Sequence, residues 1–152
     1  MEVLNVLNKD LIFLNKNFDE VNQLFDFIGM KAKALNLAKS SYGDALKKRE
    51  SEFPTALEFN NLGVAIPHAD SEHLTNEFIS LVTLDKPIKF RAMEDENKEI
   101  DVSIVFILGL QKANDQLATL QAIVELLQEE ETLKYISKAS SADEVLSKLK
   151  NG

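Results

Sequence analysis

Apolar residues in this chain follow two different repeats, one typical of strands and the other typical of helices. Short, mostly apolar runs predict strands at residues 11–14, 64–66, 78–84 and 100–108. The last run begins with alternating apolar and polar positions and then becomes wholly apolar, as in a strand covered on both faces. A turn at residues 85–87 and a short apolar segment at residues 88–90 predict an antiparallel hairpin.

Apolar residues three or four positions apart fill the intervals between these runs. They predict amphipathic helices over residues 19–37 and 42–52 and a third helix that begins near Asn114. In the third helix the aliphatic positions from Leu117 onward are expected to belong to the core. Ser141 with Glu144 predicts a capping box at the start of a last helix. Strands and helices thus alternate, which favours an α/β fold with a mixed sheet and helices on both sides.

Length and composition predict one cytoplasmic domain over residues 1–152. The chain is 45% hydrophobic and contains no cysteine, which excludes disulfides, thiol catalysis and cysteine-based metal sites. Its first residues lack the basic and apolar regions of a signal peptide, and no run approaches the ~18 apolar residues of a membrane span. The charge of −8, from 25 acidic and 17 basic residues, argues against nucleic acid as a partner.

Few of the familiar catalytic motifs are present. The five glycines are scattered and form neither a phosphate loop nor a dinucleotide fingerprint. The two histidines, His68 and His73, lack the spacing of a zinc helix motif, so no metal is expected. No serine lies on a nucleophile elbow. A paired-carboxylate glycosidase stays open, although the chain has no tryptophan to stack on a sugar ring.

One segment presents an imidazole on a restrained backbone. Residues 63–68 are Gly-Val-Ala-Ile-Pro-His, a short apolar strand that ends at Pro67 and His68. Pro67 fixes its own φ and favours an extended residue before it, while Gly63 permits either an unusual backbone geometry or a close approach at the other end. A neutral imidazole can attack phosphorus, and Arg49 is a credible donor to the transferred phosphoryl group. The plain alternatives are a strand-end histidine bonded to a carbonyl and a solvated arginine.

These residues carry a resemblance to a known family. Arg49-Glu50, the segment Phe53-Pro54-Thr55 and residues 63–68 together resemble the enzyme IIA components of the fructose/mannitol superfamily of the bacterial phosphoenolpyruvate-dependent sugar phosphotransferase system. The resemblance extends over nearly the whole chain. It implies a three-layer α/β/α sandwich around a mixed sheet.

The resemblance also implies a function and its partners. The small protein HPr would donate a phosphoryl group to His68 at Nε2, and the cysteine of enzyme IIB would accept it. Neither a cofactor nor a metal is implied. The protein would be a monomer that reaches the membrane permease IIC only through IIB.

Within the superfamily, the chain is most similar to the galactitol-type branch. The segment from Pro67 to His73 and the residues around Gln116 carry this similarity, which implies uptake of galactitol or a related sugar such as galactose. Gln116 stands where mannitol- and fructose-type members have a second histidine, and it either supports the phosphoryl group or caps a helix. His73 either flanks the site or lies on the surface. Ala56 replaces a glycine that is common in the branch.

Three functions remain open at this point. The first is a phosphoryl carrier that feeds sugar uptake. The second is a regulatory protein of the same fold, whose phosphorylation controls binding to a target protein without sugar flux. The third, a degenerate scaffold without phosphate chemistry, is opposed by the intact Arg49 and His68.

Overall fold

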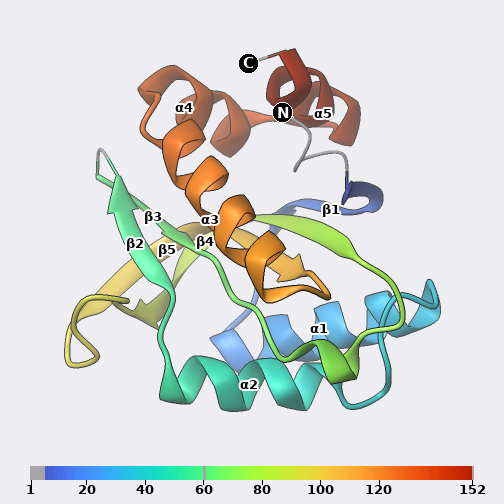
Figure 1. The fold of residues 1–152 in the computed structure, drawn as a ribbon. Helices are drawn as coiled ribbons and strands as arrows, with labels where there is room; N and C mark the ends of the chain where they lie inside the picture. The colour runs from blue at the N-terminus through green and yellow to red at the C-terminus, as the bar shows by residue number, and fades with distance from the viewer. Residues whose placement is uncertain (1–5, 60, 152) are drawn as a thin grey trace.

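The chain forms three layers, with a mixed five-stranded sheet between two layers of helices (Figure 1). The computed structural model describes residues 6–59 and 61–151. In chain order the elements are β1 (Leu7–Lys16), α1 (Val21–Ala34), α2 (Tyr42–Glu52), β2 (Ala56–Phe59), β3 (Leu62–Ala65), η2 (Ser71–His73), β4 (Phe78–Arg91), β5 (Glu99–Gly109), α3 (Ala113–Leu127), α4 (Glu130–Lys138) and α5 (Ala142–Asn151). The predicted α/β/α arrangement is confirmed.

The sheet combines parallel and antiparallel pairs. Its strand order is β1-β4-β5-β3-β2. The β1–β4 and β3–β5 pairs are parallel, whereas the β4–β5 and β2–β3 pairs are antiparallel. Because β3 and β5 run side by side in the same direction, their carboxyl ends meet at one edge of the sheet.

Each face of the sheet has its own core. Val105 and Ile107 of β5 pack with α1 and α2, whereas Ile104 and Phe106 pack with α3, α4 and α5. Successive side chains of a strand point to opposite faces, so a strand that is apolar at every position is stable only when both faces are covered. The wholly apolar second half of β5 therefore fixes its place at the centre of the sheet.

The predicted hairpin at residues 85–90 is wrong, because β4 continues through this region as a single strand. β4 pairs with β5 on both sides of a register shift between Thr83 and Ile88. Pro87 has no N–H to donate to a neighbouring strand, and such an interruption is tolerated at a bulge. The turn-like residues at 85–87 thus mark an exposed irregularity within β4.

Three elements, β2, η2 and α4, were not predicted from the sequence. β2 has only four residues, which pair with β3 and, through Ala56, form an isolated bridge to Ala92, so its alternation is too short to detect. The acidic residues at 129–131, which resemble a solvated surface, form the start of α4. Carboxylates are favourable there because the amino end of a helix carries partial positive charge.

The helices α1 and α2 lie side by side on one face of the sheet. α2 has the predicted bounds, but α1 ends at Ala34 instead of residue 37. Asn36 has a φ of 59°, a left-handed conformation that ends a helix, and the N–H of Leu37 then donates to the Ala32 carbonyl at 2.9 Å.

Candidate active site

His68 lies just beyond the carboxyl end of β3, where the chain runs between α3 and α2 toward η2 (Figure 1). The N–H of Leu108 donates to the Pro67 carbonyl at 2.9 Å, and His68 forms an isolated parallel bridge with Leu108. The pairing of β3 with β5 is therefore continued as far as the histidine. In open α/β sheets, ligands bind outside the carboxyl ends of the strands, which is where His68 lies.

The segment leading to His68 is restrained over its whole length. Val64, Ala65 and Ile66 are fully buried, as predicted for a strand covered on both faces. A Cβ atom on Gly63 would collide with the Asp101 carbonyl, so the expected close approach at this glycine is confirmed. At the other end, Pro67 restricts φ. The histidine is thus held by backbone that has little freedom to move.

The surroundings of His68 favour one protonation state and one tautomer. Its Nδ1 lies 3.3 Å from the Ile66 carbonyl oxygen. A carbonyl can only accept, so this bond requires the proton on Nδ1 and leaves a lone pair on Nε2. Burial is the largest effect and lowers the pKa of His68; the Ile66 bond offsets it in part, the Arg49 charge lowers the pKa further, and Asp70 has the smallest, raising effect. The imidazole is therefore neutral at neutral pH.

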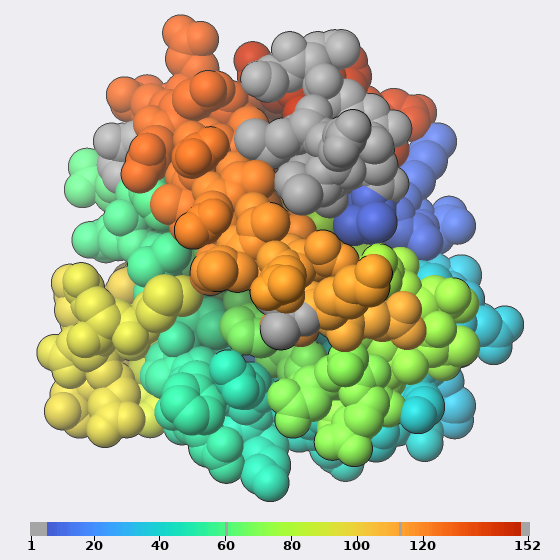
Figure 2. Space-filling view, viewed as in Figure 1, coloured from blue at the N-terminus to red at the C-terminus, as the bar shows by residue number. Residues whose placement is uncertain are grey.

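A hollow of about 200 Å³ opens beside His68. Its other lining residues are Leu108 and three residues of α3, namely Gln116, Leu117 and Leu120. The Nε2 amide of Gln116 donates to the Leu110 carbonyl at 3.1 Å, which ties the first turn of α3 to the end of β5. Gln116 thus both anchors its helix and faces the histidine. Figure 2 shows this face of the molecule, where the surface is hollowed between α3 and α2.

Leu117 corrects the prediction that the aliphatic positions of α3 are core from this residue onward. Its side chain is 58% exposed. Leu117 lies in the first two turns of α3, beyond the edge of the sheet, so it borders the hollow instead of packing against a strand. Ile123 and Leu127, farther along the helix, are fully buried as expected.

Arg49 lines a second hollow, of about 170 Å³, in the last turn of α2. Its guanidinium carbon lies 4.4 Å from the centre of the Phe53 ring, a distance suited to a cation–π contact. The Nε atom is buried and has no hydrogen-bond partner in the described part of the chain. Its charge nevertheless reaches His68, since it lowers the pKa of that residue. Arg49 thus keeps one N–H without a partner among the described residues and lies near enough to His68 for its charge to affect that pKa.

His73 lines the Arg49 hollow and not the one beside His68. Its Nδ1 lies 2.7 Å from the Ser41 hydroxyl oxygen, and its backbone carbonyl accepts a bond from the Lys39 N–H at 2.9 Å. One quarter of the side chain is exposed. His73 is thus a half-buried wall of the site and holds the η2 turn against the start of α2.

Glu50 and Thr55 form a contact that sequence reasoning missed. Glu50 is only 8% exposed, and its two carboxylate oxygens accept bonds from the Thr55 N–H and hydroxyl, each at 2.8 Å. The Thr55 carbonyl in turn accepts a bond from the Ile66 N–H at 3.3 Å. The available signal was an acid directly after Arg49, followed by Pro-Thr. Ala56, the next residue, has no positive φ, so it fits where relatives of this branch have glycine.

Comparison with known proteins identifies the family to which this site belongs. The family model described as "Phosphoenolpyruvate-dependent sugar phosphotransferase system, EIIA 2" matches residues 5–152. The chain belongs to this EIIA family. It is therefore a component of a phosphoryl-transfer system, as the resemblance of residues 49–68 implied.

Two curated relatives and one solved structure are similar to this EIIA chain. The galactitol-specific EIIA component of Escherichia coli K12 is 26% identical over 120 residues, covering 79% of each chain. A Bacillus subtilis 168 protein named "Probable licABCH operon regulator" is 31% identical over 121 residues, which cover 80% of this chain and 17% of that protein. The Escherichia coli complex of enzyme IIA-Mtl with phosphorylated enzyme IIB-Mtl matches with a TM-score of 0.78 and 19% identity, covering 96% and 98% of the two chains.

The described residues of the EIIA structure form neither a metal site nor a membrane-spanning helix. Across residues 6–59 and 61–151, no three His, Asp or Glu side chains gather as possible metal ligands. Within the same ranges, none of the helices combines the length and apolar character that crossing a membrane requires.

Proposed function

We propose that this EIIA chain carries a phosphoryl group on Nε2 of His68, which it accepts from phosphorylated HPr and passes to the cysteine of enzyme IIB. The observation that supports this most directly is the neutral His68 ring, whose Nδ1 proton is bonded to Ile66 while Nε2 keeps its lone pair. The ring borders an open hollow, and Arg49, whose buried Nε–H has no partner among the described residues, lines a second one.

The two transfers balance without a metal or nucleotide. In the first, the Nε2 lone pair forms a bond to phosphorus while the P–N bond of the donor imidazole breaks and its electron pair returns to the donor nitrogen. In the second, the IIB thiolate forms an S–P bond, the P–Nε2 bond breaks and its electron pair returns to Nε2. In each transfer the acceptor gains the phosphoryl group that the donor loses.

Arg49 stabilises the phosphoryl oxygens during both transfers. Charge on a metaphosphate-like group is spread over its oxygens, so a fixed guanidinium that donates to them lowers the barrier. Gln116 offers a neutral donor from α3, where a second histidine would offer a charged one. Pro67 keeps the His68 backbone in place, and His73 keeps the wall of the Arg49 hollow in place.

Both partners dock on the face that contains the two hollows. Leu117, which is 58% exposed, borders the His68 hollow. Phe53, which is 56% exposed, contacts Arg49. Charged residues line the Arg49 side: Lys48, Glu52, Asp70 and Glu72. A small apolar centre with a charged rim suits partners that must bind and leave quickly. We infer a cytoplasmic monomer that meets the permease only through IIB.

The sugar is galactitol or a related sugar such as galactose. The 26% identity with the galactitol-specific EIIA component supports this choice. The test is a phosphotransfer assay with phosphoenolpyruvate, enzyme I and HPr, followed by a panel of IIB and IIC partners. We expect an acid-labile, base-stable label that passes to galactitol-type IIB. Full labelling of the His68→Ala variant would refute the assignment of His68.

A regulatory role is the second candidate. It is supported by the 31% identity with a segment of a protein named as an operon regulator. In this role, phosphorylation of His68 would control binding to a target protein without sugar flux. Labelling occurs under both candidates, so the assay with IIB and IIC separates them: only the carrier restores sugar phosphorylation.

A further inference from the structure

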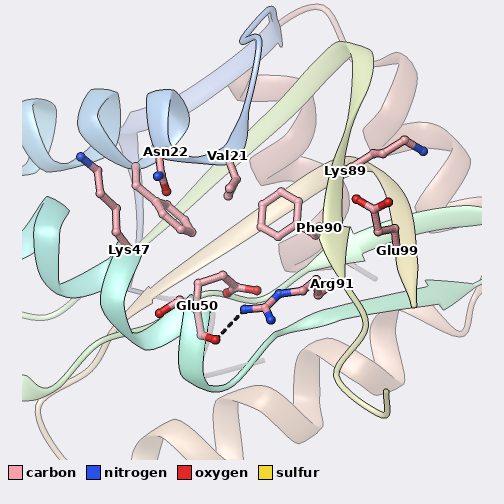
Figure 3. A pocket seen from close by; sticks show the side chains of 10 residues that line it. Val21, Asn22, Lys47, Glu50, Lys89, Phe90, Arg91 and Glu99 are labelled. Carbon is pink, nitrogen blue, oxygen red and sulfur yellow. Dashed lines mark hydrogen bonds between the residues drawn. The ribbon is translucent and has the colours of Figure 1, made fainter. Parts of the chain in front are cut away.

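Glu50 is a buried carboxylate that faces away from the phosphoryl site. It follows Arg49 on α2, and successive helical residues point about 100° apart, so the two side chains line different hollows. Glu50 lines a hollow of about 150 Å³ between α1, α2 and β4. Figure 3 shows Glu50 in this hollow with Arg91, whose guanidinium donates to the Ser51 carbonyl. Glu50 therefore has no direct contact with a group bound at His68.

Burying this carboxylate costs free energy. Burial raises the pKa of Glu50, and the two bonds from Thr55 and the charge of Arg91 offset this only in part. Buried acids are rare unless their oxygens are satisfied by hydrogen bonds. Both oxygens of Glu50 accept bonds from one residue, Thr55, which is itself almost fully buried. The carboxylate thus holds Thr55 at two atoms, its backbone nitrogen and its hydroxyl oxygen.

A continuous series of hydrogen bonds leads from Thr55 to Nδ1 of His68, whose proton defines the tautomer. The Thr55 carbonyl accepts the Ile66 N–H, and the Ile66 carbonyl accepts the Nδ1 proton of His68, each at 3.3 Å. A shift of Thr55 moves the strand that carries the Ile66 carbonyl. The Nδ1 bond is already long, so a small shift is enough to break it.

We propose that Glu50 is a positioning residue, which holds Thr55 so that the Ile66 carbonyl keeps the His68 proton on Nδ1 and leaves Nε2 free to accept the phosphoryl group. This inference rests on the proposed function of His68. It gives the Arg-Glu pair two separate roles, in which Arg49 acts on the phosphoryl oxygens and Glu50 acts on the acceptor nitrogen through Thr55 and Ile66.

The test compares Glu50→Met with Glu50→Gln in the full chain. Methionine has a similar shape but leaves the buried Thr55 N–H without an acceptor. Glutamine can accept from that N–H and donate to the Thr55 hydroxyl after the hydroxyl rotates, so it can rebuild both contacts. Nitrogen-15 NMR of the imidazole rings reports the tautomer without any phosphoryl donor. Glu58→Met, which removes an exposed carboxylate of β2, is the matched control.

We expect Glu50→Met to mix the two His68 tautomers and to slow phosphoryl transfer from HPr about tenfold, less than the roughly hundredfold loss that a 1 Å misplacement can cause. Glu50→Gln and the control should keep the Nδ1–H form and nearly the full rate. A folded Glu50→Met protein with the wild-type tautomer overturns the inference. So does a Glu50→Gln protein that shifts the tautomer as far, since charge instead of hydrogen bonding would then be responsible.

Thr55→Val provides a second test in case Glu50→Met does not fold. It removes only the hydroxyl bond to Glu50 and keeps the backbone one. We expect a smaller shift toward mixed tautomers, with Thr55→Ser restoring the wild-type spectrum, whereas an unchanged spectrum in Thr55→Val overturns the inference. Failure of the wild-type protein to take up phosphate would instead refute the proposed function, because the tautomer is measured without phosphate.

Discussion

The two hollows that flank residues 67–73 differ in chemical character. On the α2 side the lining is charged and includes Arg49, Asp70 and His73. On the α3 side it is mainly apolar, with Gln116 as its polar member beside His68 itself. A charged surface suits electrostatic stabilisation of a transferred group, and an apolar surface suits the docking of a protein. The two hollows are lined by helices, α2 and α3, that cover opposite faces of the same sheet.

This difference separates two tasks that a phosphoryl carrier has to combine. In the proposed carrier, burial favours the neutral form of the His68 ring, while Arg49, the cation proposed to stabilise the phosphoryl oxygens, lines the other hollow, away from the apolar surface. Variants on the α2 side should therefore change the rate of transfer. Variants on the α3 side should change the affinity for the partner.

The largest effect is expected at Arg49. Arg49→Gln should slow transfer from HPr about a hundredfold, comparable to the loss of one donor from an oxyanion site. Arg49→Lys should recover only part of this, because an ammonium lacks the planar geometry of the guanidinium. Single-turnover labelling measures the rate. Lys48→Gln removes a neighbouring exposed charge and should have little effect; an equal loss in Lys48→Gln would mean that only net charge matters on the α2 side.

The next largest effect is expected at Leu117 on the α3 side. Leu117→Asp should raise the KM for phosphorylated HPr about tenfold, because burying an unpaired carboxylate at the centre of an interface costs about 1–2 kcal/mol or more. The rate at saturating donor should fall much less than in Arg49→Gln. Steady-state kinetics separates the two parameters. Met30→Asp changes another exposed apolar residue, on α1, and serves as the control.

The pH dependence tests whether the Arg49 charge on the α2 side affects the pKa of His68. In the proposed function the nucleophile is the neutral ring, and its pKa lies below the ordinary value of 6.5, so the decline of transfer with falling pH should be centred below 6.5. In Arg49→Gln one cause of the lowering is removed, and the decline should begin at a higher pH. NMR titration of His68 measures both values. The same pKa in both proteins would show that the Arg49 charge does not contribute to the lowering.

The smallest effect is expected when charge is added to the α3 side. Gln116→His places a second imidazole beside His68, where it can donate to the phosphoryl oxygens. In an open hollow such a contact contributes at most about 1 kcal/mol, so the lifetime of the phosphorylated protein should change by less than about fivefold. The decay of the label at pH 6 and pH 8 measures it. A change as large as that at Arg49 would abolish the distinction between the two sides.

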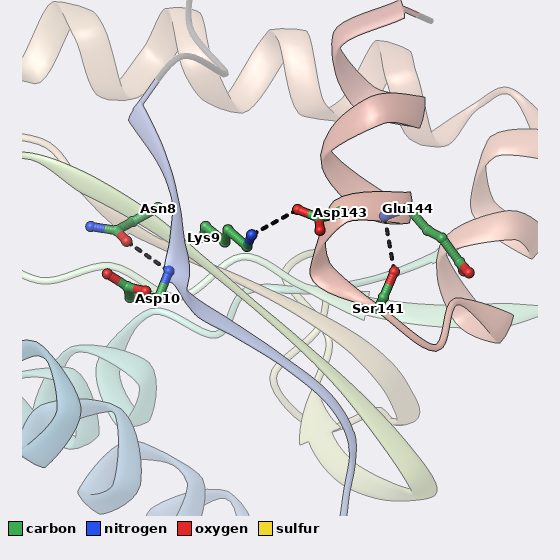
Figure 4. A network of polar contacts seen from close by, with 6 residues as sticks. All are labelled: Asn8, Lys9, Asp10, Ser141, Asp143 and Glu144. Atoms are coloured by element: carbon green, nitrogen blue, oxygen red, sulfur yellow. Dashed lines mark hydrogen bonds and ion pairs between the residues drawn. The ribbon is translucent and has the colours of Figure 1, made fainter.

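Strongly patterned elements could be predicted from the sequence because their local signals agree with the fold. The bounds of α2 and the central position of β5 follow from spacing and from continuous apolar character. At the start of α5, the Ser141 hydroxyl accepts the Glu144 N–H at 3.2 Å, as in the predicted capping box (Figure 4). The Glu144 carboxylate, however, accepts from the N–H of Ser140 instead of Ser141. A Lys9–Asp143 ion pair, also in Figure 4, links this helix to β1.

Elements whose character depends on a distant partner could not be predicted. β4 passes through three turn-forming residues because β5 pairs with it on both sides of the shift. β2 is a strand because β3 lies beside it. In the site, His68 and Arg49 could be chosen as candidates from their motif, but the exposure of Leu117 depends on where α3 extends beyond the sheet.

The sequence by itself determined which residues have the chemistry: an imidazole behind a proline, an arginine on a helix, and apolar runs that require two covered faces. Only the tertiary structure decided that the Glu50 carboxylate holds Thr55, that Arg49 and His73 line one hollow, and that Gln116 lines another with His68. The physical reason is that local patterns record which faces of an element are apolar. Hydrogen bonds and electric fields depend on distances between segments that are far apart in the chain.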